Sequence, residues 1–172
     1  MGQPAAGEVM PNGSFKTLSH SAFQVTYPAN WEVFGDESSS VTIAPRAGMT
    51  ADAVAYGAII NGFQPEASGA SVTLGDATRQ LLDSLRQSNP DLRVIGHDED
   101  IRLNGLPAKV VSLTGDSPIK GPDGHPLLER DRLITCLRTE GTLFYVIFVS
   151  PDSASRQLAP TFDKMQNSLR VY

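Results

Sequence analysis

Apolar and polar residues alternate along several short segments in the first third of the chain. Phe23, Val25 and Tyr27 share one face of an extended segment, with polar residues between them. The pattern pauses at Pro28 and resumes at Trp31, the only tryptophan. The alternation predicts β-strands over residues 15–18, 23–27, 31–34, 41–44 and 53–63.

Two other segments repeat apolar residues at helical spacing. One is predicted to be a helix over residues 76–87, with Asp76 as its N-cap. The other begins at Asp152 or Ser153. At Pro160 the missing amide hydrogen predicts a kink, or a helix whose main part begins at Ala159. The apolar stripe of this last helix consists of Leu158, Phe162, Met165 and Leu169.

The second half of the chain predicts an antiparallel sheet. Asn104–Gly105 is a strong hairpin signal because both residues tolerate positive φ. The segment 143–150 is apolar on both faces, which is typical of a central strand. The predicted strands cover residues 101–103, 108–113, 127–138 and 143–150.

The segment 115–126 is long for a hairpin connection, and it is rich in Gly and Pro. Long loops are usually functional or disordered, so we expect an exposed loop here that contributes to an interaction surface. The residues that would form this surface are Asp116, Ser117, Lys120, Asp123 and His125.

Strands, a helix, hairpins and a last helix follow one another in an order typical of the α+β class. We predict one domain over residues 14–172, an antiparallel β-sheet of about six to seven strands with helices packed on its faces. Residues 1–13 are rich in Pro and Gly and have little apolar content, so we expect a disordered linker. A Met-Gly start on such a leader favours a piece excised from a longer protein.

Charge and composition argue against a nucleic-acid partner and against a membrane-spanning segment. The chain has 172 residues, with 14 Lys and Arg against 19 Asp and Glu. Because its basic residues are scattered, we predict no nucleic-acid partner. Its longest apolar runs are far too short to span a bilayer, so we predict no transmembrane segment. The single cysteine, Cys136, excludes an internal disulfide and is interpreted as a buried strand residue.

Few residues suggest chemistry, and we predict no catalytic, metal-binding or cofactor-binding residues. His20, His97 and His125 have no second metal ligand at helical spacing. The alternative is a small metal-dependent protein or enzyme that uses His97 and His125 with nearby aspartates such as Asp98 and Asp123.

Charges alternate along the segment Glu129-Arg-Asp-Arg132. In a strand this places Glu129 and Asp131 on one face and the two arginines on the other. We interpret the segment as a solvent-facing ladder of cross-strand pairs.

The arrangement resembles the PsbP-like fold, which includes photosystem II extrinsic proteins and the Ran-binding Mog proteins. The resemblance covers residues 14–172 and implies an α/β/α sandwich. The motifs that carry it are Phe23-x-Val-x-Tyr-Pro-x-x-Trp31, Asn104-Gly-x-Pro-Ala108, Tyr145-Val-Ile-Phe148 and Phe162-x-x-Met-x-x-Ser168.

Three further segments look like the C-terminal accessory domain of bacterial HtpX-type zinc metallopeptidases: 41–48, 55–58 and 87–93. Those enzymes need a His-Glu-x-x-His motif, which this chain lacks. The resemblance therefore implies a non-catalytic accessory or protein-binding domain of a larger bacterial extracytoplasmic protein, periplasmic or secreted. Its partner would be another protein or the parent catalytic domain. A stand-alone small-ligand binder with a pocket beside Trp31 is the remaining alternative.

Overall fold

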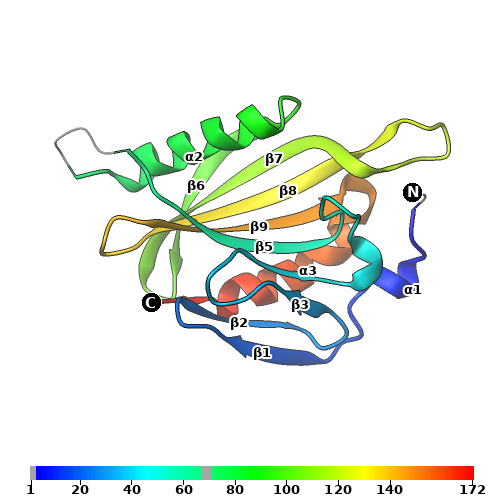
Figure 1. Ribbon diagram of the computed structural model, residues 1–172, viewed down its shortest axis with the longest axis horizontal. Helices are drawn as coiled ribbons and strands as arrows, with labels where there is room; N and C mark the ends of the chain where they lie inside the picture. The colour runs from blue at the N-terminus through cyan, green and yellow to red at the C-terminus, as the bar shows by residue number, and fades with distance from the viewer. Residues whose placement is uncertain (1–2, 67–70) are drawn as a thin grey trace.

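The computed structural model describes residues 3–66 and 71–172, and these form two antiparallel sheets and three α-helices (Figure 1). The large sheet has the strand order β3-β4-β5-β9-β8-β7-β6. Its strands are β3 (Glu32–Phe34), β4 (Val41–Ala44), β5 (Gly57–Phe63), β6 (Arg93–Leu103), β7 (Leu106–Lys120), β8 (Pro126–Leu137) and β9 (Leu143–Pro151). The small sheet has the order β1-β2-β10 and contains β1 (Phe15–Ser19), β2 (Phe23–Pro28) and β10 (Arg170–Val171).

The helices cover both faces of the large sheet. They are α1 (Ala6–Val9), α2 (Leu74–Ser88) and α3 (Asp152–Ser168), and a 3₁₀ turn spans Arg46–Gly48. In Figure 1, α2 lies on one face of the large sheet, and α3 lies between its other face and the small sheet. The predicted α+β class, with helices packed on the faces of a seven-stranded sheet, is confirmed.

The core consists of two apolar layers, one on each face of the large sheet. On the α3 side, Phe148 of β9 stacks on Phe162 with ring centroids 4.9 Å apart. On the α2 side, Leu81 packs with Leu133 of β8. Every residue of β9 is buried, so the prediction of a central strand at 143–150 is confirmed.

The helix boundaries differ from the predicted ones. Helix α2 begins at Leu74, and its N-cap is Thr73, whose hydroxyl accepts the amide hydrogen of Asp76 at 3.1 Å. The prediction of Asp76 as the cap is therefore wrong. Thr73 lies three residues earlier and is the N-cap, and Asp76 lies in the first turn of the helix. Helix α3 continues through Pro160, so a helix beginning at Ala159 is also wrong.

Residues 3–13 include the short helix α1 and contact the domain through Val9, although most of these residues are exposed; residues 1 and 2 lie outside the described part. That residues 1–13 act as a linker stays a prediction. The side chain of Val9 is only 1% exposed. The indole nitrogen of Trp31 donates a hydrogen bond to the Val9 carbonyl at 3.1 Å, and the Asn30 amide donates to the Met10 carbonyl at 2.9 Å. A buried indole N–H needs an acceptor, and the leader supplies it.

The segment 115–126 is also different from its prediction. It is mostly β-structure, because β7 continues to Lys120 and β8 starts at Pro126, leaving a turn over 121–125. The register shifts between Asp116 and Lys120, where the strand accommodates Pro118 and buries Ile119. The predicted twelve-residue loop is therefore an extended hairpin.

Candidate functional site

The five residues of the predicted interaction surface are spread along this hairpin. Ser117 is buried, whereas Asp116, Lys120, Asp123 and His125 are exposed. The Asp123 carboxylate accepts the backbone N–H of His125 at 3.0 Å inside the turn. Asp116 lies apart from the turn and lines a cleft on the α2 side of the sheet.

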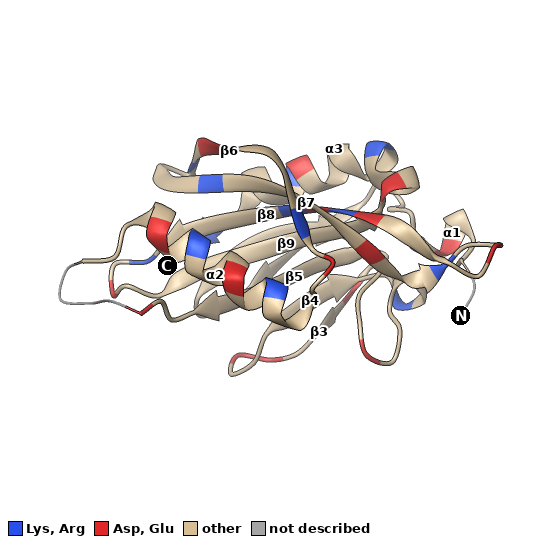
Figure 2. Cartoon of the chain, turned by 90° about the horizontal axis from the view of Figure 1, so that it is seen from above, with Lys and Arg blue, Asp and Glu red and all other residues tan. Residues whose placement is uncertain are grey.

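This cleft, called the acidic cleft below, has a volume of about 490 Å³. It lies where α2 ends and strands β7, β8 and β9 continue. Among the described residues that line it there are five carboxyl side chains and no Lys, Arg or His. The five are Asp52, Asp91, Asp116, Glu129 and Asp131. Figure 2 marks the Asp and Glu residues along the chain in red and the Lys and Arg residues in blue.

The strand register explains how β8 contributes to the acidic cleft. Glu129 pairs with Gly115 and Pro151, and Asp131 pairs with two aliphatic neighbours on β7 and β9. Cross-strand partners share a face, so both acidic side chains lie on the α2 side of the sheet. Helix α2 ends at Ser88, before it covers them.

The turn after α2 adds a third carboxylate. Asp91 accepts the backbone N–H of Asp116 at 2.5 Å. A Cβ on Gly115 would lie 3.1 Å from this carboxylate, so the glycine permits the close approach of the turn to β7. The end of α2 and the edge of the hairpin are thereby joined beside the acidic cleft.

Asp131 is the most unusual residue of the site. It is 6% exposed, and its Oδ1 atom has no hydrogen-bond partner among the described residues. A buried carboxylate oxygen without a donor is costly, since desolvation is not compensated. The interpretation of this segment as a solvent-facing ladder is therefore wrong.

The two arginines of the same segment face α3 instead. Arg130 contacts Asp152 at 2.7 Å, and Arg132 contacts Asp163 at 2.7 Å. Neither can neutralise the acidic side chains across the sheet. One signal in the sequence indicates that the acidic side chains face the core. Glu129 and Asp131 alternate with period two with Leu133, which is fully buried on the α2 side of the sheet.

The uncompensated pair titrates far from its ordinary range. Burial, followed by the charge of Asp131, raises the pKa of Glu129 to about 9. Burial raises the pKa of Asp131 to about 7. The two groups are neighbours, so they titrate as a pair that retains a proton at neutral pH.

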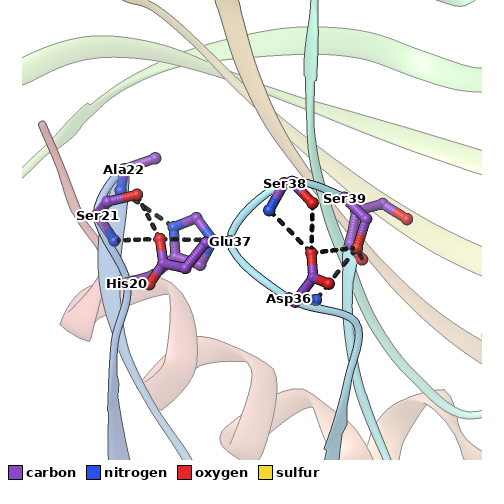
Figure 3. A network of polar contacts seen from close by, with 8 residues as sticks. His20, Ser21, Ala22, Asp36, Glu37, Ser38 and Ser39 are labelled. Carbon is purple, nitrogen blue, oxygen red and sulfur yellow. Dashed lines mark hydrogen bonds and ion pairs between the residues drawn. The ribbon is translucent and has the colours of Figure 1, made fainter.

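A second polar cluster joins the β1–β2 and β3–β4 turns (Figure 3). Glu37 accepts hydrogen bonds from the backbone N–H and the hydroxyl of Ser21, and its carboxylate lies 3.5 Å from His20 Nε2. His20 Nδ1 accepts the N–H of Ala22 at 3.0 Å. The serine hydroxyl therefore donates to the carboxylate and not to the histidine, which is not the arrangement that activates a nucleophile. The hydrogen bonds from Ser21 lower the pKa of Glu37.

The histidines of the metal-dependent alternative are far apart. His97 lies on β6 where its register faces Val110 to Ser112 of β7, whereas His125 lies beyond Lys120. Eight strand residues correspond to roughly 25 Å. Within residues 3–66 and 71–172, no group of three or more His, Cys, Asp or Glu side chains could hold a metal ion.

Two other predicted features are located by the structure. Cys136 is buried on β8, as expected for a structural strand residue, and burial raises the pKa of its thiol. Trp31 is 2% exposed and packs edge-on against Phe162, so its ring is enclosed by the core rather than presented to a ligand. None of the helices in the described ranges is long and apolar enough to cross a membrane.

No protein-family model matches the chain, and no curated protein matches it. Solved structures do share its fold. Cyanobacterial PsbP (CyanoP) from Synechocystis sp. PCC 6803 is 12% identical, with a TM-score of 0.63, and the match covers 100% of this chain and 99% of that one. The Ran-binding protein Mog1p of Saccharomyces cerevisiae is 10% identical, with a TM-score of 0.60, over 92% and 95% of the two chains.

A third similar structure is LpqN, a protein involved in cell envelope biogenesis of Mycobacterium tuberculosis. It is 13% identical, with a TM-score of 0.55, and the match covers 92% of this chain and 90% of that one. At these identities the likeness concerns the fold, and it confirms the predicted PsbP/Mog-like fold. The resemblance to the accessory domain of HtpX-type peptidases stays a prediction.

Proposed function

We propose that this chain is a non-catalytic binding domain whose acidic cleft docks a positively charged segment of a protein partner. The observation that carries the proposal is Asp131: a carboxylate held in a cleft, nine-tenths buried, with an oxygen that no described group satisfies. The other carboxyl side chains of the cleft have the same sign, and no basic side chain lines it. A cationic group from outside would complete the site.

The setting of the domain is part of the same proposal. It would be an accessory domain of a larger bacterial extracytoplasmic protein, and an HtpX-type metallopeptidase is one candidate parent. Support comes from the sequence resemblance and from similar structures whose names describe a Ran-binding protein and an envelope-biogenesis protein. Either the parent catalytic domain or a separate protein would supply the basic segment.

The test is a titration of the labelled protein with defined peptides, followed by two-dimensional ¹H–¹⁵N NMR. The probes are Gly/Ser heptapeptides that contain three arginines, or three citrullines as the neutral counterpart. We expect the arginine peptide to shift the amides of Asp91, Asp116 and the 129–131 segment, and the citrulline peptide to leave them unchanged. Saturable shifts confined to this cleft would support the function.

Two variants with the same change of charge sharpen this test. Asp131→Asn removes the buried carboxylate, whereas Glu99→Gln removes an exposed carboxylate on edge strand β6. A hydrogen bond to a charged group contributes about 1.5–3 kcal/mol, so Asp131→Asn should weaken binding by about tenfold or more. Equal affinities of both variants, or shifts spread over every acidic surface, would contradict the proposal.

A further inference from the structure

Glu129 and Asp131 lie two residues apart on one face of β8 and share the inner wall of the acidic cleft. The cross-strand neighbours of Glu129 are Gly115 and Pro151, and those of Asp131 are aliphatic. None of these neighbours can donate a side-chain hydrogen bond or supply a positive charge. Asp131 is buried and Glu129 is partly buried, and two adjacent carboxylates in such a place repel each other, so a shared proton or a bound cation stabilises the pair.

The ionisable groups that face the pair from the other elements supply no positive charge. Asp91 faces it from the turn after α2, Asp116 from β7, and Asp52 from the segment before β5. Tyr145 of β9 also lines the cleft, and burial raises the pKa of its hydroxyl. All these groups are acids, so a bound proton is the compensation that remains when the cleft is empty.

Building on the proposed function, we infer that a single lysine or arginine side chain of the partner enters the acidic cleft in exchange for the proton that Glu129 and Asp131 share, so that docking releases a proton to solvent. The incoming cation supplies the donors that Asp131 lacks. Once it is in place, both carboxyl groups are stable as carboxylates. Docking is then linked to pH: it weakens in acid, where the proton competes with the cation.

Titration calorimetry of the wild-type protein with the three-arginine peptide tests this exchange. The measurement is made at pH 7.5 in phosphate and in Tris, whose ionisation enthalpies differ widely, so the difference in observed heat counts the protons released. We expect roughly one proton per bound peptide for the wild type, because Glu129 has a pKa of about 9 in the empty cleft. Affinity should rise between pH 7.5 and pH 8.5, by about tenfold per pH unit, because the pair then holds about one proton in the empty cleft.

Glu129→Gln is the decisive variant, since glutamine imitates the protonated carboxyl group in shape. It should bind the peptide with heats that are independent of the buffer. If Glu129→Gln fails to fold, as judged by circular dichroism, the pH dependence of wild-type affinity decides instead. Wild-type binding with neither proton release nor pH dependence would overturn the exchange and leave the docking function standing. A folded wild-type protein that binds no arginine peptide would overturn both.

Discussion

Replacement of Asp131 by asparagine should stabilise the free domain at alkaline pH. The carboxyl group has an ordinary pKa of 3.8, which applies to the unfolded chain, and burial raises it to about 7 in the folded domain. The folded state therefore retains a proton that the unfolded state has already lost. Since stability falls with pH wherever the folded state binds more protons, the contribution of this carboxyl to the free energy of unfolding should decline from about pH 4 to about pH 7.

The size of this decline follows from the two pKa values. Each pH unit that separates them is equivalent to about 1.4 kcal/mol, so the buried carboxyl costs about 4 kcal/mol once it is forced to ionise. Asparagine has a similar shape and no charge, but its amide must also be satisfied. We therefore expect Asp131→Asn to be more stable than the wild type by about 2–4 kcal/mol at pH 8, and at pH 4 to be equal to it or less stable by up to about 2 kcal/mol, since the cost of the amide does not depend on pH.

Urea unfolding at pH 4, 6 and 8, followed by the fluorescence of Trp31, measures this difference. The matched control is Asp123→Asn in the exposed hairpin turn, which removes one negative charge and should show no such pH dependence. The reasoning is refuted if Asp131→Asn is less stable than the wild type at pH 8. It is equally refuted if the two proteins differ by the same amount at all three values of pH.

Three other predictions concern the packing and the metal alternative. Trp31→Phe removes the indole hydrogen bond to the Val9 carbonyl, so it should cost about 1–2 kcal/mol in thermal unfolding and speed proteolysis of the N-terminal segment. Thr135→Val removes one of two buried hydroxyl groups that lie 2.8 Å apart, the other on Thr78, and should cost about 1 kcal/mol in denaturant unfolding; no loss would argue against a satisfied pair. Addition of equimolar Zn²⁺ should leave the melting temperature unchanged, because the described residues contain no group of three or more side chains that could hold a metal ion. A rise of several degrees would support the metal-dependent alternative.

Much of the architecture was predictable because the signals are local. The alternation of Phe23, Val25 and Tyr27 and the Asn104–Gly105 turn determine strand faces and a hairpin within a few residues of chain. Asn104 indeed has a positive φ of 48°. The apolar run at 143–150 could only be placed centrally, since both of its faces need cover.

The candidate site was not predictable in the same way, because the pattern of residues 129–132 is compatible with two different environments. Alternating charge along 129–132 fits a solvent-exposed ladder as well as a strand between two layers. Which of these two environments the segment has depends on Asp152 and Asp163 of α3, which pair with the arginines, and on where α2 ends. These partners are distant in sequence, so the pattern alone gave the wrong environment for Asp131.

The position of the acidic cleft follows from the unequal lengths of helices and strands. Helix α2 has 15 residues and spans roughly 22 Å, whereas β7 has 15 residues and spans roughly 50 Å. On the α3 side, the small sheet adds a further layer beyond the helix (Figure 1). On the α2 side, one helix cannot cover the whole face, so the remainder must be polar or must be covered by another molecule. The sequence places Glu129 and Asp131 there, where Asp131 is buried, Glu129 is partly buried and burial favours the protonated form of both. A residue that destabilises the free domain is compatible with a site whose full set of contacts forms only with a partner.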